Sequence, residues 1–213
     1  MKTDNLINFK IDIQLLFYLI VAFIFATIIG TLSHEYGHFF AAKRIGLDAE
    51  LHYAYTSFAN SNHIEINAFE RILLILGGPL QTILTGIIGL SLLFANKSKI
   101  LLLNKLNLKY WIYVFLSLFW LRQTANFVMG LIGYLINGKF SQKGDEARLE
   151  MYFQIPEWSI SLTTALLGLF IAVFVIFKFI PINQRLTFIF AGLIGGISGY
   201  YIWIESIGKL SMP

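Results

Sequence analysis

Residues 13 to 43, IQLLFYLIVAFIFATIIGTLSHEYGHFFAAK, join a long apolar run to His34, Glu35 and His38. The part from residue 13 to residue 33 is long enough to cross a bilayer, which takes about 20 mostly apolar residues. Helix-forming residues continue to the end of the quoted stretch, so the three polar side chains belong to the same helix. An ionisable side chain at mid-bilayer costs roughly a few kcal/mol, so these three residues need an explanation.

The composition places the chain among integral membrane proteins. Of its 213 residues, 57% are hydrophobic and only 13% are charged, whereas soluble domains carry about a quarter charged residues. The net charge of +4 is spread over several loops without a basic cluster. It therefore favours the lipid bilayer, and not nucleic acid, as a neighbour. Because the chain has no cysteine, disulfides and thiolate metal ligands are excluded.

Five segments are long and apolar enough to form membrane spans. They cover residues 13–33, 71–95, 110–137, 159–180 and 184–206. With five spans, the loops that follow the first and the third span lie on the same side of the membrane. Lys and Arg are divided almost evenly between the two sides, so the positive-inside rule predicts no orientation. We expect an all-α polytopic membrane protein with a single transmembrane domain over residues 1–213.

The segment between the first and second spans, residues 49–67, has the character of β-strands. The stretches LHYAYTSF and HIEIN alternate in polarity, and Asn60, Ser61 and Asn62 between them are turn formers. We expect a short membrane-associated β-hairpin whose turn lies at these three residues.

His34, Glu35 and His38 have the spacing of a metal site. Residues four apart on a helix share a face, so the imidazoles of His34 and His38 can bind one metal ion. Glu35 lies next to them and can accept a proton from a metal-activated water, which is the chemistry of H-E-x-x-H. A catalytic zinc keeps three protein ligands and lowers the pKa of bound water to about 7. The competing interpretation is a pair of interfacial histidines that hydrogen-bond to headgroups.

The stretch HEYGHFFAAKRIGL resembles the active-site helix of the site-2 protease family, intramembrane zinc metalloproteases in which H-E-x-x-H ends a membrane span. GGPLQTILTG in the second span resembles the Gly-Pro segment of that family, and GDEARL after the third span resembles its Asp-Gly segment. The resemblance implies a minimal form without a PDZ domain. Its protease-like core would cover about residues 13–153, with additional helices at about 159–206.

The resemblance also implies that Asp145 is the third zinc ligand. Asp145 follows the third span, so it faces the same side of the membrane as His34. The sequence departs from the family pattern where Glu146 replaces the usual Gly and Thr82 a frequent Asn. An alternative is that the chain is a membrane zinc protease of a different kind, in which Glu146 or Glu150 is the third ligand. We expect Asp145 to begin a short helix, whose amino-terminal end favours a carboxylate, and Glu150 to face headgroups or water.

Three polar residues, Arg122, Gln123 and Asn126, interrupt the third span. Arg122 and Asn126 share a helix face, and Arg122 falls near the middle of the span. They could line a water-filled site, with Asn126 as a candidate substrate or oxyanion contact, or form an interhelical polar clamp. His52 and His63 are expected on the surface of the hairpin and not among the ligands.

Together these patterns favour a zinc-dependent intramembrane endopeptidase that cleaves transmembrane segments of membrane-anchored proteins by metal-activated water. Glu35 would be the catalytic base, and His34, His38 and Asp145 would bind one Zn²⁺ per chain. One alternative is a catalytically inactive relative that binds membrane helices or metal without cleavage. A small transporter is another, although the chain lacks the paired interrupted halves of such folds. The size and composition suggest a bacterial cytoplasmic (inner) membrane.

Overall fold

The computed structural model describes residues 6–59, 65–138 and 144–212. Five of its helical stretches are long and apolar enough to span a membrane, which confirms the expected all-α class. Along the chain the helices are α1 (Ile13–Arg44), α2 (Ala68–Ala95), α3 (Lys97–Leu101), α4 (Leu108–Ser117), the 3₁₀ turn η1 (Leu118–Trp120), α5 (Leu121–Asn137), α6 (Asp145–Phe153), α7 (Ser159–Phe179), α8 (Ile182–Tyr200), the π-helical turn η2 (Tyr201–Ile207) and α9 (Gly208–Ser211).

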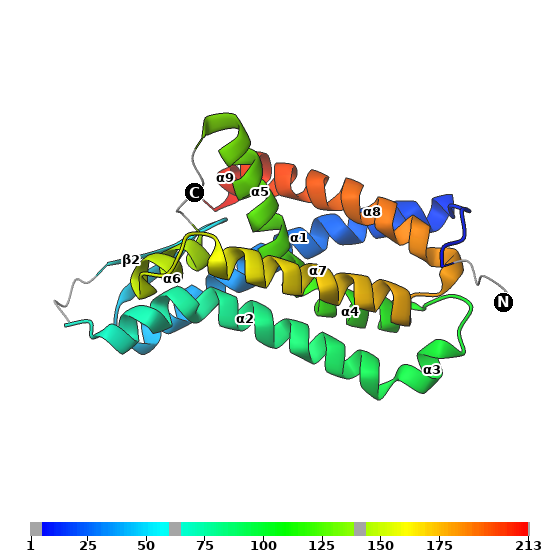
Figure 1. The fold of residues 1–213 in the computed structure, drawn as a ribbon, viewed down its shortest axis with the longest axis horizontal. Helices are drawn as coiled ribbons and strands as arrows, with labels where there is room; N and C mark the ends of the chain where they lie inside the picture. The colour runs from blue at the N-terminus through cyan, green and yellow to red at the C-terminus, as the bar shows by residue number, and fades with distance from the viewer. Residues whose placement is uncertain (1–5, 60–64, 139–143, 213) are drawn as a thin grey trace.

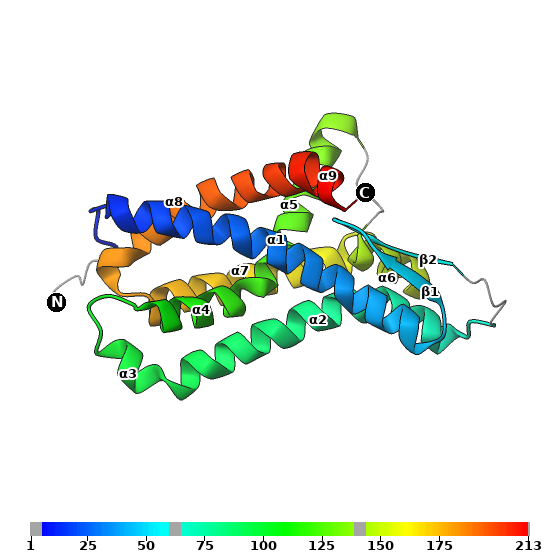
Figure 2. The ribbon, with the colours of Figure 1, turned by 180° about the vertical axis from the view of Figure 1, so that it is seen from behind.

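The long helices run roughly along one axis of the molecule, with α1 between α8 and α2 (Figures 1 and 2). Glycines bring α1 and α8 together, since a Cβ at Gly195 would lie 2.6 Å from the carbonyl oxygen of Ile20. The hairpin and α6 lie at the same end of the molecule, as the parity of five spans requires, while α3 and the start of α1 lie at the other end (Figure 2).

The larger apolar cluster occupies the end of the bundle at which α1 begins. Its fully buried side chains include Leu93 of α2, Val114 of α4 and Val175 of α7. The rings of Trp111 and Phe188 stack there, with their centroids 5.4 Å apart. At the opposite end, α1 buries His34, Glu35 and His38 together with the small side chains of Ala41 and Ala42. One end of the bundle is therefore packed for stability, and the other contains the polar groups.

The third span is not one continuous α-helix. It tightens into η1 at Leu118–Trp120 before continuing as α5, which leaves the direction of α4 (Figure 1). This turn places the indole of Trp120 against Gly86 of α2 and the backbone oxygen of Trp120 against Gly168 of α7. The hydroxyl of Thr124 then donates to the carbonyl of Ala165, at 2.8 Å. Close packing against two glycines explains a break that the apolar run itself does not indicate.

The hairpin between the first and second long helices is confirmed, but the expected position of its turn is wrong. Strand β1 (Asp48–Leu51) pairs antiparallel with β2 (Thr56–Ala59), so the turn lies at residues 52–55. There the amide of His52 donates to the carbonyl of Tyr55, at 3.0 Å. Of the expected second strand, residues 65–67 are not in a strand, and the expected turn at 60–62 lies outside the described residues.

The reason for this shift lies in contacts with the end of the chain. The indole of Trp203 donates to the carbonyl of Tyr53 at 2.8 Å, and the amide of Tyr53 donates to the carbonyl of Met212 at 3.2 Å. Both backbone groups of Tyr53 are thus satisfied, by Trp203 of η2 and by Met212 directly after α9, which fixes the turn at this residue. Alternation of polarity within the hairpin cannot reveal a partner that lies about 150 residues away.

Candidate metal centre

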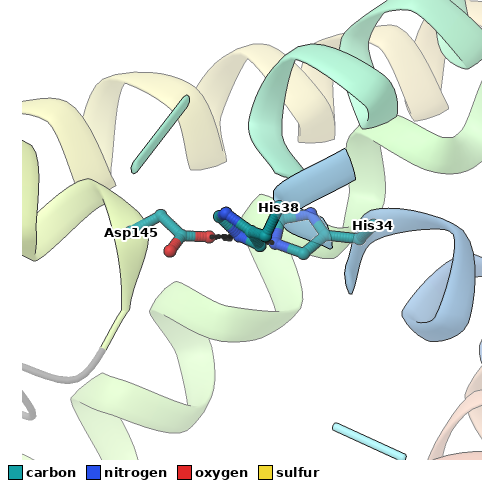
Figure 3. A group of neighbouring side chains, drawn as sticks. All are labelled: His34, His38 and Asp145. Atoms are coloured by element: carbon teal, nitrogen blue, oxygen red, sulfur yellow. Dashed lines mark hydrogen bonds and ion pairs between the residues drawn. The ribbon is translucent and has the colours of Figure 1, made fainter. Parts of the chain in front are cut away.

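Three side chains from two helices converge at the polar end of the bundle (Figure 3). His34 and His38 lie one turn apart on α1, and Asp145 is the first residue of α6. Both histidines are buried, and the side chain of Asp145 is 14% exposed. Among the described residues they form a group of potential ligand atoms that all lie within 4.8 Å of one another. These three side chains could hold a metal ion.

The two imidazole rings are oriented by hydrogen bonds on their far sides. Nδ1 of His38 lies 2.8 Å from the carbonyl oxygen of Leu74, which can only accept, so this nitrogen carries the proton. Nδ1 of His34 lies 2.9 Å from the hydroxyl of Thr82, which itself donates to the carbonyl of Gly78. That hydroxyl therefore accepts from His34. Such partners fix the tautomer of a metal-binding histidine, and in both neutral rings they leave a lone pair on Nε2.

The remaining donor atoms have the spacing of a tetrahedral metal site. The two Nε2 atoms are 3.3 Å apart, and Oδ2 of Asp145 lies 2.9 Å from Nε2 of His34 and 3.2 Å from Nε2 of His38. Ligands about 2.0–2.1 Å from a tetrahedral zinc lie about 3.3 Å from each other. At these distances two imidazole nitrogens and a carboxylate oxygen need a cation between them, either a shared proton, as in a hydrogen bond, or a metal ion. The donor set therefore fits a metal ion.

Gly78 of α2 leaves the space that this arrangement needs. A Cβ added at Gly78 would collide with Nε2 of both His34 and His38. Between the two histidines on α1, Gly37 contacts Gly77, and a Cβ at Gly77 would lie 2.6 Å from the carbonyl oxygen of Gly37. The glycine pair in GGPLQTILTG thus has two uses. Gly77 lets α1 and α2 approach, and Gly78 keeps the converging nitrogens free of side-chain atoms.

Glu35 lies between the third span and the hairpin. One carboxylate oxygen is 3.4 Å from a terminal guanidinium nitrogen of Arg122 in α5. The hydroxyl of Thr56 in β2 donates to the backbone carbonyl of Glu35 at 2.8 Å, and its oxygen lies 3.5 Å from the second carboxylate oxygen. The side chain of Glu35 is only 7% exposed. A carboxylate held in this way, one residue from His34, can accept a proton from a molecule bound beside the histidines.

The two acidic residues that begin α6 differ in their pKa. Burial raises the pKa of Asp145, but the contacts with His34 and His38 outweigh burial and lower it below the ordinary value for an aspartate. Burial raises the pKa of Glu146 above the ordinary value for a glutamate. Glu146 is buried but does not belong to the converging group. Of the three candidate third ligands, the structure brings only Asp145 to the histidines.

The sequence predicted that Glu150 faces headgroups or water, and this prediction is wrong. It is 4% exposed and accepts hydrogen bonds from the amide of Trp158 and from both the amide and the hydroxyl of Ser161, at 2.8–2.9 Å. These donors belong to the start of α7, where unpaired amides favour a negative charge. The hydrogen bonds of Glu150 therefore join α6 to α7 and help to fix the position of Asp145. The spacing of residues in the sequence could not show this contact.

The other polar candidates lie outside the converging group. His52 contacts the hydroxyl of Ser57 within the hairpin, at 2.9 Å, and His63 lies outside the described residues. Asn126 is exposed on α5, and Gln123 is buried. Sequence reasoning missed the direct contact of Arg122 with Glu35 and the hydrogen bond from His34 to Thr82. The signal for the contact of Arg122 with Glu35 was a charged residue inside an apolar span. The only signal for the hydrogen bond of His34 was the position of Thr82 in the Gly-Pro segment.

Comparison with known proteins adds no relative. The chain matches no family model, no curated protein sequence and no solved structure.

Proposed function

We propose that this protein is a zinc-dependent intramembrane endopeptidase of the site-2 protease type. The observation that carries the proposal is the convergence of three donor atoms, 2.9–3.3 Å apart, beside a buried glutamate on a membrane-spanning helix. Two imidazoles and one carboxylate are the ligands of many catalytic zinc sites, which keep a further position open for water or substrate. The chain has no cysteine to complete a closed structural site.

Zinc in this site would polarise the carbonyl of a peptide bond and make a water molecule more acidic. Glu35 takes a proton from that water while the oxygen of the water forms a bond to the carbonyl carbon. The C–N bond then breaks, and Glu35 gives the proton to the leaving nitrogen, so the two fragments carry a new carboxyl and a new amine. Burial of Glu35 between Arg122 and Thr56 supports this role, because it holds the carboxylate at a fixed place beside His34.

The proposed substrates are membrane-anchored proteins with a transmembrane helix. The peptide bonds of such a helix are protected because its carbonyls are hydrogen-bonded internally and water is scarce, so the helix must unwind before it is cleaved. The hairpin supports this step, since Thr56 in β2 contacts Glu35 directly. A strand beside the base can pair with an unwound segment and hold its backbone extended. A bacterial cytoplasmic membrane is the proposed location.

The test compares wild-type protein with the Glu35→Gln variant. Both should contain one zinc per chain, since the amide leaves His34, His38 and Asp145 in place. Only the wild type should cleave a panel of synthetic transmembrane peptides, because an amide cannot accept the proton of the water. Glu205→Gln, which changes an exposed glutamate of η2, is the matched control and should cleave normally. Zinc-loaded wild type that cleaves no peptide of the panel would favour a relative that binds metal or helices without cleavage.

A further inference from the structure

Arg122 is a charged residue within a membrane-spanning segment, and its hydrogen-bond donors are incompletely satisfied. Its side chain is 24% exposed, and one guanidinium nitrogen lies 3.4 Å from Glu35. The Nε atom is buried and has no hydrogen-bond partner among the described residues. An arginine has five N–H donors, and a buried donor left unpaired costs about 1–3 kcal/mol. A residue kept in the membrane at this cost is by default a candidate for function.

The contact with Glu35 does not by itself account for Arg122. Charge-assisted hydrogen bonds of this kind are usually about 2.7–2.9 Å long, so a separation of 3.4 Å is a loose ion pair. A purely structural clamp would be expected to close this distance and to satisfy Nε as well. The guanidinium instead lies beside Glu35 with donors to spare. An acceptor that arrives with the substrate would satisfy them.

We propose that Arg122 is a second catalytic residue, which donates hydrogen bonds to the carbonyl oxygen of the peptide bond that is cleaved. This inference rests on the proposed function. As water attacks the carbonyl carbon, the π electrons of the C=O bond move to the oxygen, which becomes negatively charged. A guanidinium in a water-poor site stabilises that charge more strongly than the neutral carbonyl, so it lowers the barrier. Asn126, the candidate from the sequence for this contact, is exposed one turn farther along α5.

The geometry supports this oxygen as the acceptor. The water that gives its proton to Glu35 is the molecule that attacks the carbonyl carbon, so the carbonyl oxygen must lie close to Glu35. Arg122 is the cation that contacts Glu35 within the described residues, and it comes from a different helix than the three candidate ligands. It can therefore reach the reacting carbonyl from the α5 side without displacing His34, His38 or Asp145.

The first part of the test measures cleavage kinetics of one transmembrane peptide whose cleaved bond has been mapped by mass spectrometry. Arg122→Gln should lower kcat by about 100- to 1,000-fold, the usual effect of removing one oxyanion donor, with KM changed by less than about threefold and the zinc content unchanged. Arg122→Lys keeps the charge but not the fork of donors, so its kcat should be intermediate. Arg71→Gln removes an exposed guanidinium from α2 and should match the wild type.

The second part separates contact with the substrate from mere positioning of Glu35. A phosphinic version of the same peptide has a tetrahedral, negatively charged group at the cleaved bond, and its affinity can be measured without turnover. It is titrated into zinc-loaded Glu35→Gln protein and into the double variant Glu35→Gln, Arg122→Gln. If Arg122 binds the developing charge, the double variant should bind the phosphinic peptide at least about tenfold more weakly. If Arg122 acts only through Glu35, its loss should change nothing once Glu35 is gone.

Three results would overturn the inference. Arg122→Gln could retain kcat within threefold of the wild type, or it could lose zinc in proportion to activity, which would indicate a structural role. Equal affinity of the two Glu35→Gln proteins for the phosphinic peptide would show that Arg122 does not bind the charge. In each case the wild type still cleaves, so the proposed function stands. Wild type that neither cleaves nor binds the phosphinic peptide would contradict the proposed function, and the inference falls with it.

Discussion

Replacing Gly78 by alanine tests the packing that surrounds the candidate metal site. A methyl group at this position of α2 would collide with Nε2 of both His34 and His38, the two nitrogens that converge on Asp145. The opposing contacts are ring atoms fixed by hydrogen bonds to Leu74 and Thr82, so they cannot move away freely. We therefore expect Gly78→Ala to impair zinc binding while the helix itself remains intact.

The size of the effect follows from the cost of overpacking. Forcing one extra carbon into a filled site costs about 1–3 kcal/mol, which corresponds to about 5- to 150-fold weaker zinc binding. The same change favours the helix, because alanine in a helix interior is about 1 kcal/mol better than glycine. Zinc affinity should therefore fall much more than stability. Gly30→Ala is the matched control on α1, since a Cβ there would have no other atom within 4 Å.

The assay is competition for zinc between the purified protein and a chelator of known affinity, at constant pH. Thermal unfolding of the metal-free proteins should be measured in parallel. Gly30→Ala should bind zinc like the wild type, and Gly78→Ala should bind it at least about fivefold more weakly. Zinc affinity of Gly78→Ala within twofold of the wild type would refute the assignment of the two Nε2 atoms as ligands.

Three further predictions concern residues that support the site. Thr82→Val removes the hydroxyl that accepts from His34, and zinc affinity should fall by about 10- to 100-fold, as for other outer partners of metal-binding histidines; an unchanged affinity would contradict this orientation of the ring. Glu150→Gln weakens the acceptor that joins α6 to α7, so the free energy of unfolding should fall by about 1–3 kcal/mol in chemical denaturation. A stability equal to that of the wild type would show that the contact is dispensable. Trp203→Phe removes the donor to Tyr53, and amide hydrogen exchange should become faster in the hairpin turn but not in α4.

The sequence predicted those features that depend on local chemistry. Runs of apolar residues identified all five spans, since crossing a bilayer requires about 20 of them. The spacing of His34 and His38 placed both on one face of α1, and the parity of the spans allowed Asp145 to face them. The role of Asp145 was implied by resemblance alone, and the structure brings it to the histidines.

The features that the sequence did not predict depend on contacts between distant segments. The turn of the hairpin is set by Trp203 and Met212 at the end of the chain. Glu150 looked like a surface residue because nothing in α6 indicates that the start of α7 will supply its donors. Arg122 stood out as a charge in a span, but only the break before α5 shows that it reaches Glu35. Each of these depends on how the helices pack together.

The most direct test of the central claim is zinc X-ray absorption on the purified protein, measured together with metal content. We predict one zinc per chain with a shell of nitrogen and oxygen at about 2.0–2.1 Å, and outer scattering from two imidazole rings. Asp145→Asn should lose most of the zinc, while Glu146→Gln keeps it. A wild-type protein without zinc after chelator-free purification would contradict the claim. So would bound zinc without imidazole scattering, or zinc that Glu146→Gln removes and Asp145→Asn does not.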